Sequence, residues 1–255
     1  MARHVCVIPA RMGSSRFPGK PLIPLLGLPL VIHVAQRCRL YRGFERVILA
    51  TCDQEIIDAA RTHGFEAVMT SDRHERCTDR VEEAVATLKL DLGDDDVVAM
   101  VQGDEVLVTP RMIADVVETQ VARREPVVNL ASRLYRPEDM ADINTVKVVA
   151  APDGRALYFS RAAIPSRGRA PDAACYQQTG VMAFAPSFLA RFAQLPPTPL
   201  EIIESCDMLR LLEHGLTVRI ILTETETIGI DTPADRDRGE NMLRADPTTS
   251  LYLKA

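Results

Sequence analysis

The stretch that decides the fold runs from Val5 to Leu22 and reads VCVIPARMGSSRFPGKPL. It begins with an apolar run of the length of a buried strand, and helical hydrophobic spacing resumes only after Pro21. The loop between them holds two glycines, two serines, two arginines and a lysine. Such a loop, placed between a strand and a helix, offers backbone N–H groups and cationic side chains to a phosphate chain. The stretch therefore predicts an anion site of the nucleotide-binding kind.

Two familiar phosphate motifs do not fit this loop. Five residues separate Gly13 from Gly19 where the P-loop has four, and Lys20 is followed by Pro21 where that motif has Ser or Thr. The dinucleotide fingerprint also fails, because no second glycine stands two residues after Gly13. A solvated basic surface loop is the structural alternative.

Alternating strand and helix patterns follow the loop. Residues 25–42 have helical spacing, 46–51 read as a strand, 54–63 as a helix and 65–69 as a further strand. This alternation predicts an α/β fold, a Rossmann-like, doubly wound and mainly parallel sheet. Ligands in such sheets bind beyond the carboxyl ends of the strands, so motifs that follow strands carry the most weight.

Composition limits the class of partner. The chain has 255 residues and a net charge of −5, so neither nucleic-acid nor membrane binding is expected. Its six cysteines are scattered without a CxxC pair, which is typical of reduced thiols and of a cytoplasmic protein. No apolar run approaches the length of a membrane span.

Three further motifs stand at the end of a strand or the start of a helix, and the first two have both a structural and a functional interpretation. Gln102-Gly103-Asp104-Glu105 follows a buried strand at 96–101, where it reads either as a turn or as a Mg²⁺ site. Thr78-Asp79-Arg80 begins a helix, so it serves either as a cap or as a ligand contact. Asp231 ends a strand, Thr232 can cap the next helix and Pro233 suits its first position.

The opening loop resembles the signature loop of the sugar-acid cytidylyltransferases. The shared residues are Pro9, Ala10, Arg11, Ser14, Arg16, Pro18, Gly19, Lys20, Pro21 and Leu22. The resemblance is greatest to the 3-deoxy-manno-octulosonate (Kdo) cytidylyltransferases, also called CMP-Kdo synthetases, and extends over residues 4–240. It implies transfer of CMP from CTP to an anionic acceptor, with release of pyrophosphate.

The resemblance also implies the roles of particular residues. The expected catalytic residues are Arg11, Ser14 and Lys20. The expected nucleotide contacts are Pro9, Ala10, Arg11, Ser14, Arg16, Lys20, Thr78, Arg80, Gln102 and Gly103. The expected Mg²⁺ ligands are Asp104 and Asp231. Where the family has Ser-Gly before the Thr-Asp-Arg triplet, this chain has Arg76-Cys77.

The acceptor-binding residues depart from the family pattern. A lobe at residues 134–190 is expected to bind the acceptor and, by resemblance, to carry a homodimer contact. The expected acceptor contacts are Lys147, Arg161, Gln178, Met182 and Asp207. Four family side chains, His, Tyr, Glu and Gln, are replaced by Gln178, Met182, Asp207 and Met208.

Two of these changes remove hydrogen-bonding groups, which disfavours a polyhydroxylated acceptor. Because relatives of the Kdo enzymes act on phosphonates, the replacements predict a small phosphonate, such as phosphonoformate, as acceptor. The alternatives are an authentic Kdo enzyme and a non-catalytic nucleotide-binding regulator. We expect one domain over residues 1–245, with a C-terminal tail at 246–255.

Overall fold

A nine-stranded sheet organises the chain, and the computed structural model describes it over residues 2–13 and 17–253. The strands are β1 (His4–Pro9), β4 (Arg46–Thr51), β5 (Glu66–Met69), β6 (Val97–Val101), β7 (Val127–Arg133), β8 (Lys147–Ala150), β9 (Ala156–Ser160), β10 (Tyr176–Phe184) and β11 (Arg219–Thr223). The helices are α1 (Leu30–Leu40), α2 (Gln54–Thr62), α3 (Cys77–Thr87), α4 (Pro110–Arg123), α5 (Pro137–Ala141), α6 (Pro186–Gln194), α7 (Pro199–Glu204), α8 (Met208–Glu213) and α9 (Pro233–Ala245). Two 3-10 helices, η1 (Lys20–Leu22) and η2 (Pro247–Leu251), and a short hairpin of β2 (Pro24–Leu25) and β3 (Leu28–Pro29) complete the described part.

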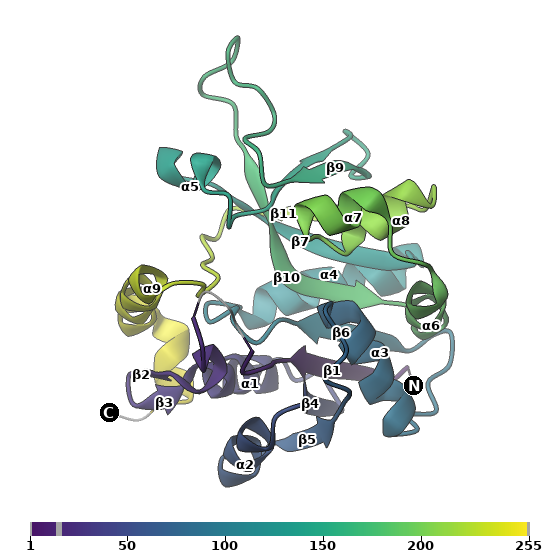
Figure 1. The fold of residues 1–255 in the computed structure, drawn as a ribbon, viewed down its shortest axis with the longest axis vertical. Coiled ribbons are helices and arrows are strands. Elements are labelled where there is room, and N and C mark those ends of the chain that lie inside the picture. Colours follow the sequence, from purple (N-terminus) through teal and green to yellow (C-terminus); the bar gives the residue numbers. More distant parts are fainter. Residues whose placement is uncertain (1, 14–16, 254–255) are drawn as a thin grey trace.

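The main path of the sheet is mostly parallel. Its strand order is β11-β7-β10-β6-β1-β4-β5, and β10 alone runs antiparallel to its two neighbours, β6 and β7. The hairpin of β8 and β9 extends one end of β10 (Figure 1). The predicted α/β fold with a mainly parallel sheet is confirmed.

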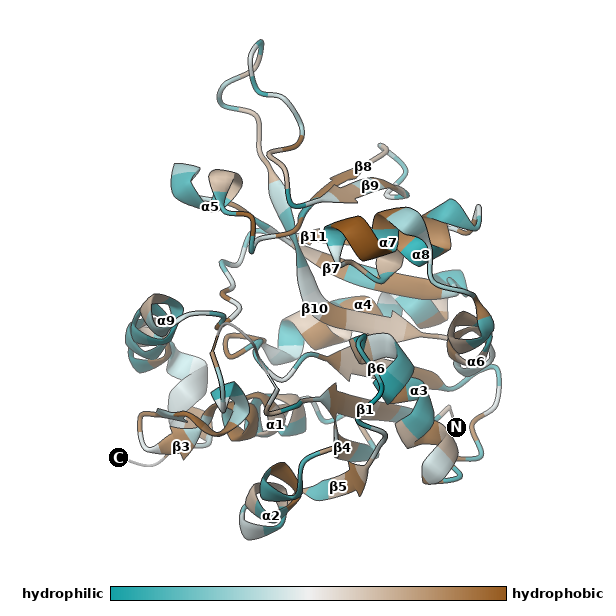
Figure 2. Cartoon of the chain, viewed as in Figure 1, coloured by the Kyte–Doolittle hydropathy of each residue, from teal (hydrophilic) through white to brown (hydrophobic). Residues whose placement is uncertain are grey.

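Helices cover both faces of the sheet, and the strand residues alternate between two hydrophobic cores. Cys6 and Ile8 of β1 pack with α1 and α4, whereas Val5 and Val7 pack with α3, α6 and α8. The central strands are therefore apolar on both faces, as Figure 2 shows by their brown colour.

Capping chemistry in the sequence determines where two helices begin. Helix α9 begins after Thr232, whose side chain accepts a hydrogen bond from the backbone N–H of Asp235 while the Asp235 carboxylate reaches back to Thr232. Helix α4 begins after Thr109, with Pro110 at its first position. The predicted helix at 25–42 is shorter in the structure, because residues 24–29 form the β2–β3 hairpin and α1 begins at Leu30.

The segment predicted to be a C-terminal tail is packed against α1. The Arg37 guanidinium is fully buried and donates to Asp246 at 2.5 Å and to Thr249 at 3.0 Å. The Tyr252 hydroxyl lies 2.8 Å from Nδ1 of His33. Buried polar partners on α1 hold residues 246–252 in place, so this segment belongs to the domain.

Residues 134–190, predicted to be a lobe, divide into two parts. Strand β10 is a central strand of the sheet, whereas the β8–β9 hairpin and the loop before β10 project from it (Figure 1). Over the described residues, no helix combines the length and the apolarity needed to cross a bilayer.

Candidate active site

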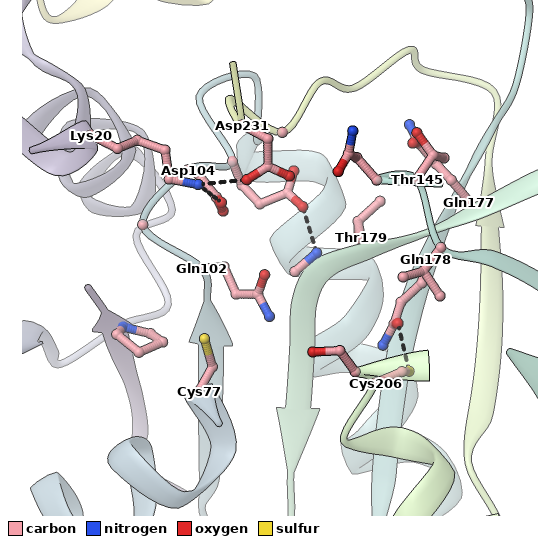
Figure 3. Close-up of a pocket in the computed structure, with 18 of the residues that line it drawn as sticks. Lys20, Cys77, Gln102, Asp104, Thr145, Gln177, Gln178, Thr179, Cys206 and Asp231 are labelled. Carbon is pink, nitrogen blue, oxygen red and sulfur yellow. Dashed lines mark hydrogen bonds and ion pairs between the residues drawn. The ribbon is translucent and has the colours of Figure 1, made fainter. Parts of the chain in front are cut away.

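A cavity of about 420 Å³ lies beyond the carboxyl ends of β1 and β6 and along β10. Pro9 and Ala10 reach it from the end of β1, and Gln102 and Gly103 reach it from the end of β6. Figure 3 shows Lys20, Asp104 and Asp231 on one side of the cavity and Gln177, Gln178 and Cys206 on the other. The cavity therefore has two chemically different ends.

Close backbone packing positions the wall between β1 and β6. The Gly103 N–H donates to the Pro9 carbonyl at 3.2 Å. A Cβ on Gly103 would lie 3.1 Å from both that oxygen and the Cβ of Ala10, so only glycine allows this approach without displacement. On the other side of β1, an Asp53 carboxylate oxygen accepts from the Met12 N–H at 2.7 Å and anchors the opening loop.

Lys20 joins two carboxylates at the first end of the cavity. Its Nζ lies 2.7 Å from Oδ2 of Asp104 and 3.0 Å from Oδ1 of Asp231. Burial alone would lower the pKa of Lys20, but the attraction of these two carboxylates outweighs burial and raises it. Lys20 is therefore a cation throughout the physiological range, and the loop, β6 and the segment before α9 meet at its ammonium group.

Glu105 lies directly behind this group. Its carboxylate is buried and accepts a hydrogen bond from the Gly180 N–H, which connects the turn after β6 to β10. Burial, together with the neighbouring charge of Asp104, raises the pKa of Glu105 to about 7. The Glu105 carboxyl group therefore connects the turn that carries Asp104 to the strand that carries Gln178.

The two aspartates fit one kind of metal ion. Across residues 2–13 and 17–253, no group of three or more His, Cys, Asp and Glu side chains is arranged to hold a metal. Asp104 and Asp231 nevertheless converge on the same ammonium group, so their oxygens can reach one cation. Two carboxylates suit Mg²⁺, which takes its remaining ligands from substrate phosphates and water. The donor set fits a Mg²⁺ ion that arrives with a polyphosphate.

Arg11 and Arg80 line the cavity beside this carboxylate pair. Arg11 donates to the His74 carbonyl at 3.3 Å, and Arg80 donates to the Ser71 carbonyl at 3.1 Å. Both guanidinium groups thus hold the loop before α3 through neutral oxygens, which leaves their positive charge available to a phosphate chain.

Arg161 occupies the opposite end of the cavity. Its guanidinium donates to backbone carbonyls on two segments, those of Ile143, Asn144, Glu204 and Ser205. Lys147 does not share this position, because its buried ammonium donates to the carbonyls of Asp142, Thr145 and Arg161 and its side chain does not line the cavity. The prediction that Lys147 contacts the acceptor is therefore not supported, and its hydrogen bonds hold the loop that carries Arg161.

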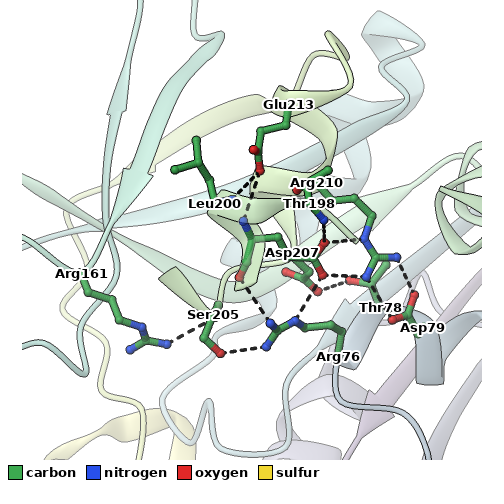
Figure 4. Close-up of polar contacts among 11 residues, drawn as sticks. Arg76, Thr78, Asp79, Arg161, Thr198, Leu200, Ser205, Asp207, Arg210 and Glu213 are labelled. Atoms are coloured by element: carbon green, nitrogen blue, oxygen red, sulfur yellow. Dashed lines mark hydrogen bonds and ion pairs between the residues drawn. The ribbon is translucent and has the colours of Figure 1, made fainter. Parts of the chain in front are cut away.

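A network of charged side chains joins the start of α3 to α7 and α8 (Figure 4). Arg210 contacts Glu201 at 2.7 Å and Asp79 at 3.0 Å, and Arg76 donates to Ser205 at 2.8 Å and approaches Glu201 at 3.3 Å. The same network includes a hydrogen bond from the Thr78 hydroxyl to Asp207. Thr78 is buried in this bond and does not line the cavity, in contrast to its predicted nucleotide contact.

Comparison with known proteins identifies the family. A model of a family described as cytidylyltransferase matches residues 5–224. The chain belongs to the cytidylyltransferase family. It is 44% identical over 250 residues to a 3-deoxy-manno-octulosonate cytidylyltransferase of Anaeromyxobacter sp. (strain Fw109-5), which covers 97% of this chain and 99% of the relative. It is 43% identical over 242 residues to the protein of that name from Nitratidesulfovibrio vulgaris (strain DP4), covering 93% and 95%.

A solved structure agrees with this cytidylyltransferase over nearly its whole length. A CMP:2-keto-3-deoxy-manno-octonic acid synthetase complexed with CTP superimposes with a TM-score of 0.85 at 33% identity, covering 96% of this chain and 99% of that chain. The predicted resemblance to the CMP-Kdo synthetases is confirmed, and the protein is a nucleotidyltransferase. The alternative of a non-catalytic regulator is not supported.

The prediction of a phosphonate acceptor is also not supported. The relatives are Kdo enzymes by name, and two of the four replacements on which the prediction rested lie away from the cavity. Met182 is fully buried in the core of the cytidylyltransferase, opposite Met100 of β6, and Met208 is fully buried at the start of α8. Neither side chain can meet an acceptor hydroxyl.

The structure brings most of the other predicted residues to the cavity wall. These are Pro9, Ala10, Arg11, Lys20, Arg80, Gln102, Gly103, Asp104, Arg161, Gln178, Asp207 and Asp231. Ser14 and Arg16 lie outside the described residues. Sequence reasoning assigned no role to Asp53. It read Glu105 only as part of the motif after β6 and Arg76 only as a departure from the family pattern, because their contacts are to distant segments.

Proposed function

We propose that this cytidylyltransferase transfers CMP from CTP to 3-deoxy-manno-octulosonate and releases pyrophosphate. The observation that carries the proposal is the agreement, over nearly the whole chain, with enzymes of that name and with a synthetase complexed with CTP. A cavity of about 420 Å³, with cations and carboxylates at one end and an arginine and amides at the other, suits two ligands held side by side.

The reaction is a displacement at the α-phosphorus of CTP. An acceptor hydroxyl oxygen forms the new bond to the α-phosphorus, and its proton passes to solvent water. The bond from the α-phosphorus to the oxygen that bridges to the β-phosphorus breaks, and its electron pair leaves with pyrophosphate. Arg11 and Lys20 hold the β- and γ-phosphates and stabilise the charge that develops on the leaving group. Their positions, Arg11 just after β1 and Lys20 at the start of η1, also align the triphosphate with the acceptor.

Asp104 and Asp231 are the residues that would hold Mg²⁺. When bound, the ion would supply positive charge to neutralise the phosphates. Lys20, which contacts both carboxylates in this structure, is the neighbouring cation for phosphate oxygens at this end of the cavity.

Arg161 is the candidate partner for the carboxylate of the sugar acid. Its contacts to carbonyl oxygens orient the guanidinium but do not neutralise it, because carbonyls carry no net charge. The arginine fork matches a carboxylate in geometry as well as in charge.

The test is pyrophosphate release from CTP and Mg²⁺ with Kdo and phosphonoformate offered separately. We expect steady-state turnover with Kdo and only background release with phosphonoformate. An Asp231→Asn variant provides the inactive control, since it keeps the shape of the site and removes one carboxylate. Turnover of phosphonoformate far above that of Kdo would overturn the assignment of the acceptor while leaving cytidylyl transfer intact.

We also propose that the enzyme is a homodimer. Ile143, Ile202 and Ile203 are 70%, 63% and 74% exposed. Arg161 binds carbonyls of both segments that carry them, so these isoleucines lie on the two segments that meet at Arg161. Light scattering of the wild type and of an Ile203→Asp variant tests the proposal: we expect a dimer and a monomer, and a monomeric wild type would contradict it.

A further inference from the structure

Asn129 of β7 is a fully buried polar side chain behind the acceptor end of the cavity. The pairing of β10 with β7 shifts register between Gln178 and Met182, and Asn129 lies at this irregularity. Its Nδ2 donates to the carbonyls of Thr179 at 2.9 Å, Leu130 at 3.1 Å and Val181 at 3.2 Å. The reversed amide would place its oxygen against three carbonyl oxygens, so the orientation of Asn129 is fixed by chemistry.

The fixed orientation of Asn129 determines that of Gln178. Because Oδ1 of Asn129 must point away from the three carbonyls, it accepts a hydrogen bond from Nε2 of Gln178 at 2.9 Å. Oε1 of Gln178 is then turned toward Cys206, whose Sγ lies 3.2 Å away (Figure 3). Gln178 and Cys206 both line the cavity.

Gln178 therefore presents its carbonyl oxygen to the cavity in a fixed orientation, and its NH₂ group does not take that place. A thiol is a weak donor, so Oε1 of Gln178 retains the capacity to accept a stronger hydrogen bond. A ligand hydroxyl or ammonium group supplies such a bond, whereas a carboxylate, phosphonate or ether oxygen at the same place is repelled.

We propose that Gln178 is a specificity-determining residue that selects a hydrogen-bond donor on the acceptor, and that Asn129 is the positioning residue that fixes its polarity. The inference rests on the proposed function, since it assumes that the acceptor occupies this end of the cavity. The acceptor must present a hydroxyl or an amine to Gln178. Asn129, which does not line the cavity, then contributes to acceptor specificity through Gln178.

The test compares Kdo with analogues in which single hydroxyl groups are replaced by fluorine, which is of similar size but cannot donate. For one hydroxyl position, we expect the wild type to lose about tenfold in kcat/KM, the effect of leaving one polar group unsatisfied. Gln178→Met should erase this discrimination, and Asn129→Ala should weaken it by freeing the amide to turn over. The KM for CTP should stay within about twofold of the wild type in both variants, a separation that a merely structural role would not produce.

Gln120→Met is the matched control, because Gln120 is a buried glutamine on α4 that donates to the Glu125 carbonyl away from the cavity. It should retain the full discrimination between hydroxyl and fluorine. Unchanged discrimination in Gln178→Met would overturn the role of Gln178, and unchanged discrimination in Asn129→Ala would overturn the role of Asn129.

A second measurement does not depend on the acceptor. In the ligand-free protein labelled with ¹⁵N, one side-chain amide proton of Gln178 should be protected from exchange with solvent, and Asn129→Ala should remove the protection. Unprotected protons in the wild type would refute the orientation. If the wild type turns over no Kdo yet shows this protection, the assignment of the acceptor fails and the orientation of Gln178 stands.

Discussion

Lys20 occupies the place between Asp104 and Asp231 where a metal ion would bind, so Lys20→Met should tighten Mg²⁺ binding and at the same time strongly reduce turnover. Its ammonium lies 2.7 and 3.0 Å from the two carboxylates. At an effective dielectric constant of about 20, each contact corresponds to a gross attraction of about 6 kcal/mol, before desolvation is subtracted. If only about 1.4 kcal/mol of this survives as competition with the metal ion, the variant should bind Mg²⁺ about tenfold more tightly without nucleotide.

Two assays separate the two effects of Lys20→Met. Calorimetric titration of the nucleotide-free protein with Mg²⁺ measures the gain in affinity, and pyrophosphate release measures the loss in kcat, which we expect to be about 100- to 1000-fold. Lys20→Arg keeps the charge and should bind Mg²⁺ like the wild type. Lys89→Met, an exposed lysine beyond α3, controls for the loss of a positive charge. Mg²⁺ binding no tighter than that of the wild type would refute the shared site.

Four further variants test the carboxylate pair, the contact between β1 and the turn after β6, the packing of the C-terminal segment, and the buried Asp207. Asp231→Asn should lower kcat at least about 100-fold, and raising the Mg²⁺ concentration should not restore it. Gly103→Ala should raise the KM for CTP and cost about 1–3 kcal/mol of stability in urea unfolding, because its Cβ would meet the end of β1 at 3.1 Å. Arg37→Met should lower the free energy of unfolding by about 3 kcal/mol, since it leaves a carboxylate of the C-terminal segment without its buried partner. Burial raises the pKa of Asp207 above its ordinary value of 3.8, so ionisation of this carboxyl group destabilises the folded protein as the pH rises. Asp207→Asn should therefore be more stable than the wild type at pH 7. Urea unfolding at pH 3.5 should show no difference in stability between the two proteins.

The fold and the phosphate end of the site could be predicted from the sequence because their signals are local. The apolar run of β1, the loop after it and the Thr232-Pro233 helix start each depend on neighbouring residues. Lys147 could not be placed in this way. Whether a strand lysine faces solvent, a ligand or a set of carbonyls depends on the loops at 142–145 and 161, which close around it only in the folded chain.

The acceptor end shows why aligned substitutions alone were a poor guide to specificity. Strand β10 is buried on both faces, so its apolar run from Val181 to Phe184 does not reveal which face a side chain takes, and Met182 was wrongly placed in the cavity. Asn129 is the opposite case, because nothing in the sequence indicated that it would lie at the site. It belongs to no motif and does not line the cavity, yet its hydrogen bonds orient the amide of Gln178. Selection of a hydrogen-bond donor on the acceptor is therefore a property of the Asn129–Gln178 pair. Transferring Gln178 alone into a relative that lacks the asparagine would transfer an amide of undefined polarity.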